Sequence, residues 1–144
     1  MQTLNSLKQI LIAFFEQHKQ IKAVKYEDDF NFNAERALEY PVCNIEYAES
    51  NLTNKKLAHT YKIILGDLVD VNIEGHEDEI YSDLMLIAED FFAWLQYQEG
   101  FEFIKSSSIQ KFSDDTSDRV SGFTFRITLS LIRTANICII PTVS

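Results

Sequence analysis

The chain has 144 residues, of which 46% are hydrophobic, so it is long enough to bury a core as one domain without disulfides or a structural metal. Thirteen basic residues against 22 acidic residues give a formal net charge of −9, the wrong sign for a protein that grips phosphate backbones through a basic patch. Only four glycines and two prolines are present, which argues against flexible linkers, collagen-like repeats and low-complexity tracts.

The first element that the sequence predicts is an amphipathic helix from about Thr3 to His18. Leucine and phenylalanine recur there three and four residues apart, and charged residues occupy the opposite face, so the helix is expected to lie on an apolar surface. A short strand is expected over residues 21–26. Residues 27–40 are polar and irregular, and because such a loop is longer than usual in a compact domain, it is expected to have a functional or interface role.

A long β-hairpin is predicted next. Hydrophobic and polar residues alternate over residues 42–49, residues 50–56 have turn composition, and the return arm alternates again over residues 57–65. The return arm is expected to bend near Gly66. Arms of this length often reach beyond their own sheet.

An amphipathic helix is then predicted to extend to about Gln98, with Gly100 as its stop. Its start is indicated by carboxylates at positions 74 and 77–79, which offset the positive end of a helix macrodipole. Hydrophobic residues follow at spacings of four, three, four and four, namely Ile80, Leu84, Ile87, Phe91 and Leu95.

Short strand pieces are expected over residues 101–105 and 109–112, followed by a polar turn over 113–118 and a long strand from Val120 to Ile132. In the long strand, one face is apolar and the other carries Thr124, Arg126, Thr128 and Ser130. This polar face is either solvated or a docking surface, and the sequence leaves both interpretations open.

A second apolar segment, Ile137 to Pro141, follows a polar break. We expect Ile137, Ile139 and Ile140 to pair with the sheet edge of a neighbouring subunit, because the segment is too short to be a stable strand without an edge to join. The alternative is that it folds back on its own sheet. Deleting residues 137–144 distinguishes the two, since only the first leaves a folded monomer that no longer assembles.

The order of elements predicts an α+β fold in a single domain over residues 1–144: an antiparallel sheet, joined by hairpin-length connections, with two helices packed on one face. The facing sets of helices and sheet predict the core. Its expected members are Leu7, Leu11, Phe14, Ile63, Leu84, Ile87, Phe91, Leu95, Phe125, Ile127 and Leu129.

No residue spacing in the sequence indicates catalysis or a metal site. His18, His59 and His76 are scattered, without the ligand pairs of a zinc site, and no Walker loop, GxGxxG or GxSxG is present. The acidic run at 74–79 is better explained as a helix start than as a cation site, and the serines and aspartates at 113–118 as a turn. We therefore expect no enzyme activity, no cofactor and no metal.

Cys43 and Cys138 each lie in an apolar, strand-like context and are expected to behave as small hydrophobes rather than to form a disulfide. No secretory signal pattern opens the chain, and no apolar run approaches the roughly 20 residues that span a bilayer. The expectation is a soluble protein made in a reducing cytoplasm.

Taken together, the leading amphipathic helix, the long hairpin, the central aromatic helix and the final strand resemble the tail-terminator and tail-completion proteins of tailed bacteriophages. The C-terminal pattern is similar to the ends of neck or tail proteins in viruses of Bacteroidetes, including the crAss-like group. It runs Phe123-Thr124-Phe125-Arg126-Ile127-Thr128-Leu129 and then Asn136-Ile137-Cys138-Ile139-Ile140-Pro141.

The resemblance implies a structural virion protein located in the tail or neck. Its subunits would form a ring, commonly hexameric, at the head-proximal end of the tail. The ring would contact tail-tube and head–tail connector proteins, and DNA would pass through its lumen without specific binding. An acidic wall suits that task, because it does not attract the sliding DNA. The candidate subunit-interface residues are Ile137, Ile139, Ile140, Thr124, Arg126 and Thr128.

Two other classes of function remain open at this stage. One is a bacterial α+β module that binds a peptide or small ligand in a groove between sheet and helices. The other is a small hydrolase with an unrecognised site. Oligomeric state separates the ring subunit from both.

Overall fold

A computed structural model describes residues 3–28, 30, 39–53, 56–114 and 119–131. This part of the chain forms two helices and six strands. In chain order they are α1 (Leu4–Gln17), β1 (Ala23–Lys25), β2 (Val42–Thr53), β3 (Lys56–Leu68), α2 (His76–Gln96), β4 (Phe101–Ser106), β5 (Gln110–Asp114) and β6 (Val120–Leu131). The predicted α+β class is confirmed.

The described strands make one sheet in the order β1-β2-β3-β6-β4, with β5 also paired to β6. Most pairs are antiparallel, as predicted, but β1 runs parallel to β2, so the sheet is mixed. Because β3 and β4 are both antiparallel to β6, they run parallel to each other, and α2 is the crossover between them. The expectation of hairpin-length connections throughout is therefore wrong at α2 and at the segment between β1 and β2.

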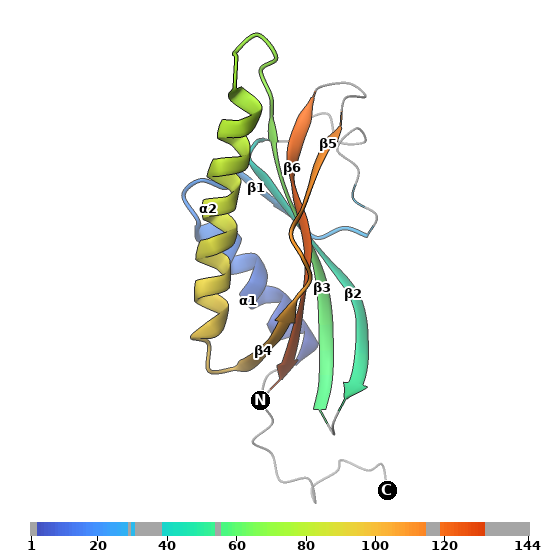
Figure 1. Ribbon diagram of the computed structural model, residues 1–144. Helices are drawn as coiled ribbons and strands as arrows, with labels where there is room; N and C mark the ends of the chain where they lie inside the picture. The colour runs from blue at the N-terminus through green and yellow to red at the C-terminus, as the bar shows by residue number, and fades with distance from the viewer. Residues whose placement is uncertain (1–2, 29, 31–38, 54–55, 115–118, 132–144) are drawn as a thin grey trace, which may run out of the picture.

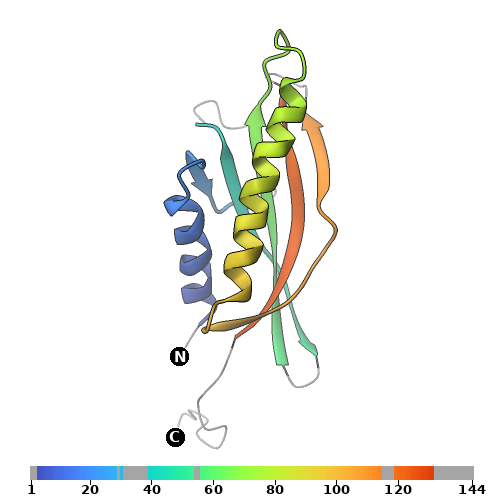
Figure 2. The same cartoon turned by 60° about the vertical axis from the view of Figure 1, so that its left-hand side comes forward.

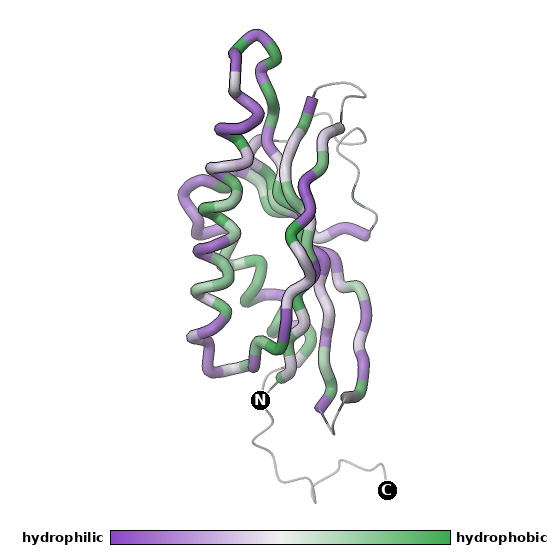
Figure 3. The backbone as a smooth tube through the Cα atoms, viewed as in Figure 1, coloured by the Kyte–Doolittle hydropathy of each residue, from purple (hydrophilic) through white to green (hydrophobic). Residues whose placement is uncertain are grey.

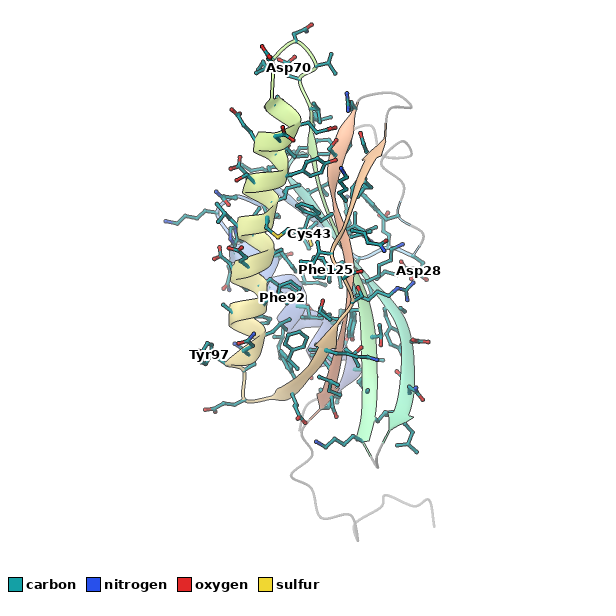
Figure 4. All side chains as sticks on the ribbon, viewed as in Figure 1. Asp28, Cys43, Asp70, Phe92, Tyr97 and Phe125 are labelled. Carbon is teal, nitrogen blue, oxygen red and sulfur yellow. The ribbon has the colours of Figure 1, made fainter. Side chains whose placement is uncertain are left out.

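The two described helices pack on the same face of the sheet (Figures 1 and 2), which confirms the predicted layering. A capping box starts α1: Ser6 N–H donates to Thr3 Oγ1 at 3.1 Å, and Thr3 N–H donates to Ser6 Oγ at 2.7 Å. Figure 4 shows Cys43, Phe92 and Phe125 between α2 and the sheet, whereas Asp28 lies on the opposite side of the sheet.

The core forms between the helices and the sheet. Phe14 was predicted to be buried in the core, but it is half-buried and its neighbour Phe15 is fully buried instead. Helical spacings of three and four residues fix the buried face only to within one residue, so either phenylalanine fits the pattern. The other predicted members are buried, namely Leu7, Leu11, Ile63, Leu84, Ile87, Phe91, Leu95, Phe125, Ile127 and Leu129.

The ends of two predicted elements need correction. Residues 50–53 and 56 lie in the strands of the hairpin rather than in a turn, since Ser50 pairs with His59. The strand pairing of the hairpin thus continues through polar residues, which are tolerated because this end of the strands is exposed. Helix α2 ends at Gln96 with Tyr97 as its C-cap, so Gly100 does not stop it. The glycine that shapes α2 is instead Gly75, which occupies the N-cap with φ +75°.

Strands β3 and β6 approach very closely where Gly66 pairs with Gly122. A Cβ atom at Gly122 would lie 1.8 Å from the Leu65 carbonyl oxygen, well inside any van der Waals contact. Glycine is therefore required at this position, because only a residue without a side chain lets the two central strands meet.

Strands β4 and β5 follow one another along the same edge of β6, with three residues between them. Ser107 lies in this interruption and still joins the ladder: its N–H donates to the Arg126 carbonyl, and its Oγ accepts from the Arg126 N–H, both at 2.8 Å. A serine hydroxyl thus replaces the missing backbone acceptor, so the edge stays attached to β6 between β4 and β5.

Candidate functional site

The sheet face opposite the helices carries the sequence-predicted polar residues. We call it the outer sheet face and define it by Lys62, Thr124, Arg126, Thr128 and their cross-strand neighbours. Thr124 is half-buried, Arg126 is exposed, and Thr128 is buried with its hydroxyl 3.1 Å from that of Thr60. Ile137, Ile139 and Ile140, the other predicted interface residues, lie outside the described part of the chain.

A groove of about 650 Å³ crosses the outer sheet face between the hairpin and β4. Arg126 and Thr128 line it, and Ala58 and Ile104 supply apolar surface. Its remaining lining is polar or charged, with Glu49, Asn51, Lys56, Thr60, Glu102, Lys105, Ser106 and Ser107. Two predicted residues thus meet in one hollow, while Thr124 lies farther along the same strand.

The charges of the groove are partly paired. Lys56 Nζ lies 2.8 Å from Glu102 Oε2, and both side chains are more than half exposed, so this bridge contributes little to stability. For Lys105 and Arg126 the structure records no ion pair with another described residue. These two cations are therefore available to a partner.

A row of charges crosses the three central strands of this face. Glu46 pairs in register with Lys62, and Lys62 pairs with Arg126, so two cations lie directly opposite each other on β3 and β6. Both belong to a second hollow of about 400 Å³ that also includes Asp28. Like charges at directly opposed positions destabilise a sheet, and Glu46, which pairs with Lys62 from β2, supplies a compensating carboxylate.

The opposite layer of the molecule is acidic. Helix α2 contains six carboxylates and no lysine or arginine, and Glu79, Asp83 and Glu89 are exposed on its outer side. Leu86 lies among them and is 52% exposed. Helix α2 thus carries six carboxylates, whereas the outer sheet face carries cations together with carboxylates such as Glu46, Glu49 and Glu102.

Exposed aliphatic side chains also occur at both ends of the molecule. Val71 (68% exposed) and Ile73 lie in the loop between β3 and α2, where Figure 3 shows hydrophobic residues among hydrophilic ones. Leu52 (71% exposed) and Leu57 lie near the tip of the β2–β3 hairpin, at the opposite end in Figure 1. These side chains are candidate contact points for other proteins.

A polar network ties the first turn of α2 to the sheet. Glu77 Oε2 accepts from Ser121 Oγ at 2.6 Å and from Arg119 Nη2 at 2.8 Å, and it lies 3.4 Å from Ser113 Oγ. The hydrogen bond from Ser121 and the nearby Arg119 guanidinium hold the pKa of Glu77 below its usual range. Every group has a partner within the network, so its role is structural.

A serine and a histidine meet in the half of the hairpin nearer its tip, a juxtaposition that the scattered histidines of the sequence do not reveal. Ser50 Oγ lies 2.6 Å from His59 Nδ1, and it also hydrogen-bonds the Tyr47 hydroxyl. Cross-strand register brings these residues together. A hydrolase would also need oxyanion donors beside the serine, and an edge strand of a hairpin does not offer the helix N-terminus or nest that usually supplies them.

Within the described residues, no group of three or more His, Cys, Asp or Glu side chains is placed to hold a metal ion. Cys43 is fully buried, and burial raises the pKa of its thiol well above the usual value. None of the described helices combines the length and hydrophobicity that crossing a membrane requires.

No model of a known protein family matches the chain, and no curated protein is significantly similar to it. Function is therefore argued from the surfaces of this molecule.

Proposed function

We propose that the protein is a structural subunit of a phage virion, assembling into a ring at the head-proximal end of the tail. The ring joins the tail tube to the head-side connector and lets DNA pass through its lumen. The starting point is the resemblance of the whole sequence to tail-terminator and tail-completion proteins.

The observation that carries the proposal is that apolar or charged side chains are exposed on three separate surfaces of this two-layer domain. Aliphatic side chains are exposed at both ends of the molecule, near Leu52 and near Val71, and Lys105 and Arg126 lie on the outer sheet face without an ion pair to another described residue. We assign a contact to each of these three surfaces. A ring subunit uses all three, because it contacts its neighbours laterally and a different partner at each end of the ring.

The test is the oligomeric state of the purified full-length chain. Size-exclusion chromatography with light scattering should give one discrete oligomer, and negative-stain electron microscopy should show rings with an open centre. A monomer at every concentration up to about 200 μM, more than a hundredfold above the dissociation constant of a stable micromolar assembly, would contradict the proposal.

A gene located beside portal, tail-tube or terminase genes is the expected genomic context. Adding purified tail tubes encoded by the same genome should place the rings at one end of each tube. Binding along the sides of the tubes would contradict a role at the head-proximal end.

A binding module for a peptide or small ligand is the second candidate, and the groove of about 650 Å³ favours it. The location differs from the expected one, since the space between sheet and helices is filled by the core and the groove lies on the outer sheet face. A monomer that binds acidic peptides with a dissociation constant below about 100 μM, and loses that binding in Arg126→Ala, would support this candidate instead.

A further inference from the structure

We propose that residues 137–140 of one subunit add as a strand to the open edge of β2 in the next subunit. Backbone hydrogen bonds then join each copy to its neighbour, and alternate side chains of the added strand pack on the two faces of the sheet. This inference rests on the proposed ring and specifies the contact that builds it.

The receiving edge is the second half of β2. Strand β1 pairs only with Val42–Asn44, so among the described strands residues 48–53 have a neighbour, β3, on one side alone. On the other side, alternate N–H and C=O groups of a strand point away from the sheet and can bond an added strand. The opposite edge is a poorer template, because β4 and β5 have only 6 and 5 residues and are separated by residues 107–109.

Exposed leucines lie beside this edge. Leu52 pairs in register with Leu57 of β3, and both side chains are exposed. In an added strand, Ile137 and Ile139 share one face, and Cys138 lies on the other. We place the two isoleucines on the face of Leu52, because cross-strand aliphatic neighbours then cover its exposed side chain.

The end of β6 brings residues 137–140 to the correct end of the sheet. Strand β6 ends at Leu131, directly after Ser130 pairs with Ala58, and Figure 1 shows this end beside the tip of the β2–β3 hairpin. The segment consists of isoleucines and one cysteine, and β-branched residues favour strands. Pro141 follows and ends the run of backbone donors.

A neighbouring subunit is a better acceptor than the segment's own subunit. Because β3 and β2 lie between, a strand added to β2 would be three strand spacings from β6, about 14 Å. The chain from Leu131 to Ile137 spans at most about 21 Å. Within one subunit it would therefore cross the sheet almost fully extended, with little length left to pass around the hairpin. Docking on a neighbour removes this constraint, and repetition of such an unlike contact closes into a ring.

Cross-linking through Cys138 tests the contact in the full-length chain. Asn51→Cys and Glu49→Cys each place a thiol on the face of β2 opposite to Leu52, which is the face assigned to Cys138. A short bismaleimide should join each variant to Cys138 of another copy and give a ladder of covalent oligomers on a denaturing gel. Adding Cys138→Ser should abolish the ladder, since Cys43 is fully buried.

The matched control is Glu102→Cys, which places an exposed thiol on β4 at the opposite edge of the sheet and should give no ladder. A ladder through Glu102→Cys alone, or a link within one chain identified by mass spectrometry, would overturn the proposal. Rings that form without any link to the β2 variants would also overturn it and leave the proposed function standing. If the native chain is a monomer, the proposed function fails together with this contact.

Proline substitution tests the backbone hydrogen bonds separately. Because N–H groups alternate along a strand, one of Cys138→Pro and Ile139→Pro removes a donor that faces β2. That variant should raise the concentration at which half of the chain is assembled by at least about tenfold, as measured by light scattering, with circular dichroism as the check of folding. Ile139→Val keeps the N–H and should assemble like the native chain. Native-like assembly of both proline variants would show that no strand is added at this edge.

Discussion

Tyr61 lies at the centre of the sheet with its side chain fully buried and its ring 5.6 Å from that of Tyr47. Its hydroxyl is the one buried side-chain oxygen or nitrogen atom, among those described, without a hydrogen-bond partner. Burial raises the pKa of this phenol far above its usual value, so the group stays neutral. A buried hydroxyl without a partner typically costs 1 to 3 kcal/mol, which makes Tyr61 a weak point of the core.

We therefore expect Tyr61→Phe to raise the free energy of unfolding by about 1 kcal/mol, because it removes the unsatisfied oxygen and keeps the ring. Thermal denaturation measures the change. Tyr47→Phe is the matched control, since it deletes a hydroxyl that hydrogen-bonds Ser50 and should lower stability. A lower Tm in Tyr61→Phe would show that the hydroxyl has a stabilising partner in solution.

Glu77 gives stability that depends on pH. Its pKa is lowered in the folded state, first by the hydrogen bond from Ser121 and then by Arg119. The stabilisation is therefore present above the unfolded pKa of about 4.3 and lost as the pH falls through the lower folded value. We expect Glu77→Gln to lower stability by about 1 kcal/mol at pH 7, a modest effect because the pair is partly exposed.

The measurement is urea unfolding of both proteins from pH 7 down to pH 3. The two curves of stability against pH should converge at the acid end. Glu79→Gln, which removes an exposed carboxylate on the same helix, should run parallel to the native curve. A constant difference between Glu77→Gln and the native protein at every pH would exclude ionisation of Glu77 as its source.

At the scale of elements, the joint between β3 and β6 depends on Gly122. Because an added Cβ would meet the Leu65 carbonyl at 1.8 Å, Gly122→Ala must separate the two central strands. We expect a loss of about 2 to 4 kcal/mol, comparable to severe overpacking of a core. Gly75→Ala is the control: its positive φ also strains the backbone, but no atom lies within 4 Å of its added Cβ, so the loss should be about 1 kcal/mol.

The layers are held together by an aromatic cluster around Phe91 of α2. Its ring lies 4.7 Å from Phe15 of α1 and 6.3 Å from Phe125 of β6, so one side chain joins both helices to the sheet. We expect Phe91→Ala or Phe125→Ala to cost about 3 to 5 kcal/mol. Tyr97→Ala removes an aromatic ring that is 82% exposed and should change stability by less than about 0.5 kcal/mol. Unchanged thermal midpoints in both phenylalanine variants would refute this role.

The sequence predicts elements better than it predicts their pairing. Local periodicity places α1, α2 and β6 to within a few residues, because the hydrophobic residues of each recur at its own regular spacing. The parallel β1–β2 pair and the crossover through α2 depend on contacts between distant segments, which no local pattern contains. The turn predicted at residues 50–56 fails for a related reason, since cross-strand hydrogen bonds extend the hairpin through polar residues.

The same limit applies to the candidate site. Alternation along β6 places Arg126 and Thr128 on the outer sheet face from sequence alone. The groove, however, also needs Lys105 from β4, and the opposition of Lys62 and Arg126 needs the register of β3 with β6. Both features depend on how distant segments of the chain pack together. The charge pattern gives no signal for them, since the strands carry carboxylates such as Glu46, Glu49 and Glu102 as well as lysines and an arginine.

At the scale of the whole molecule, one sheet and one core connect all the described elements. Residues of α1, α2 and four strands meet in the same buried cluster. We therefore expect one cooperative unfolding transition, with equal calorimetric and van't Hoff enthalpies, when the protein is studied as a monomer in dilute solution. Two separate transitions in a scanning calorimeter would show that the hairpin or α1 unfolds independently.

The insertion of β6 between β3 and β4 has a consequence for biosynthesis. The ribosome makes β6 after every other described strand, yet β3, β4 and β5 all pair with it. Until residues 120–131 leave the exit tunnel, the nascent chain has a hairpin and two helices but no strand to join its halves, and closing this long-range pairing is slow. The groove is then also incomplete, because β6 supplies Arg126 and Thr128 to it. We therefore expect the groove on the outer sheet face to form only after residues 120–131 have been synthesised.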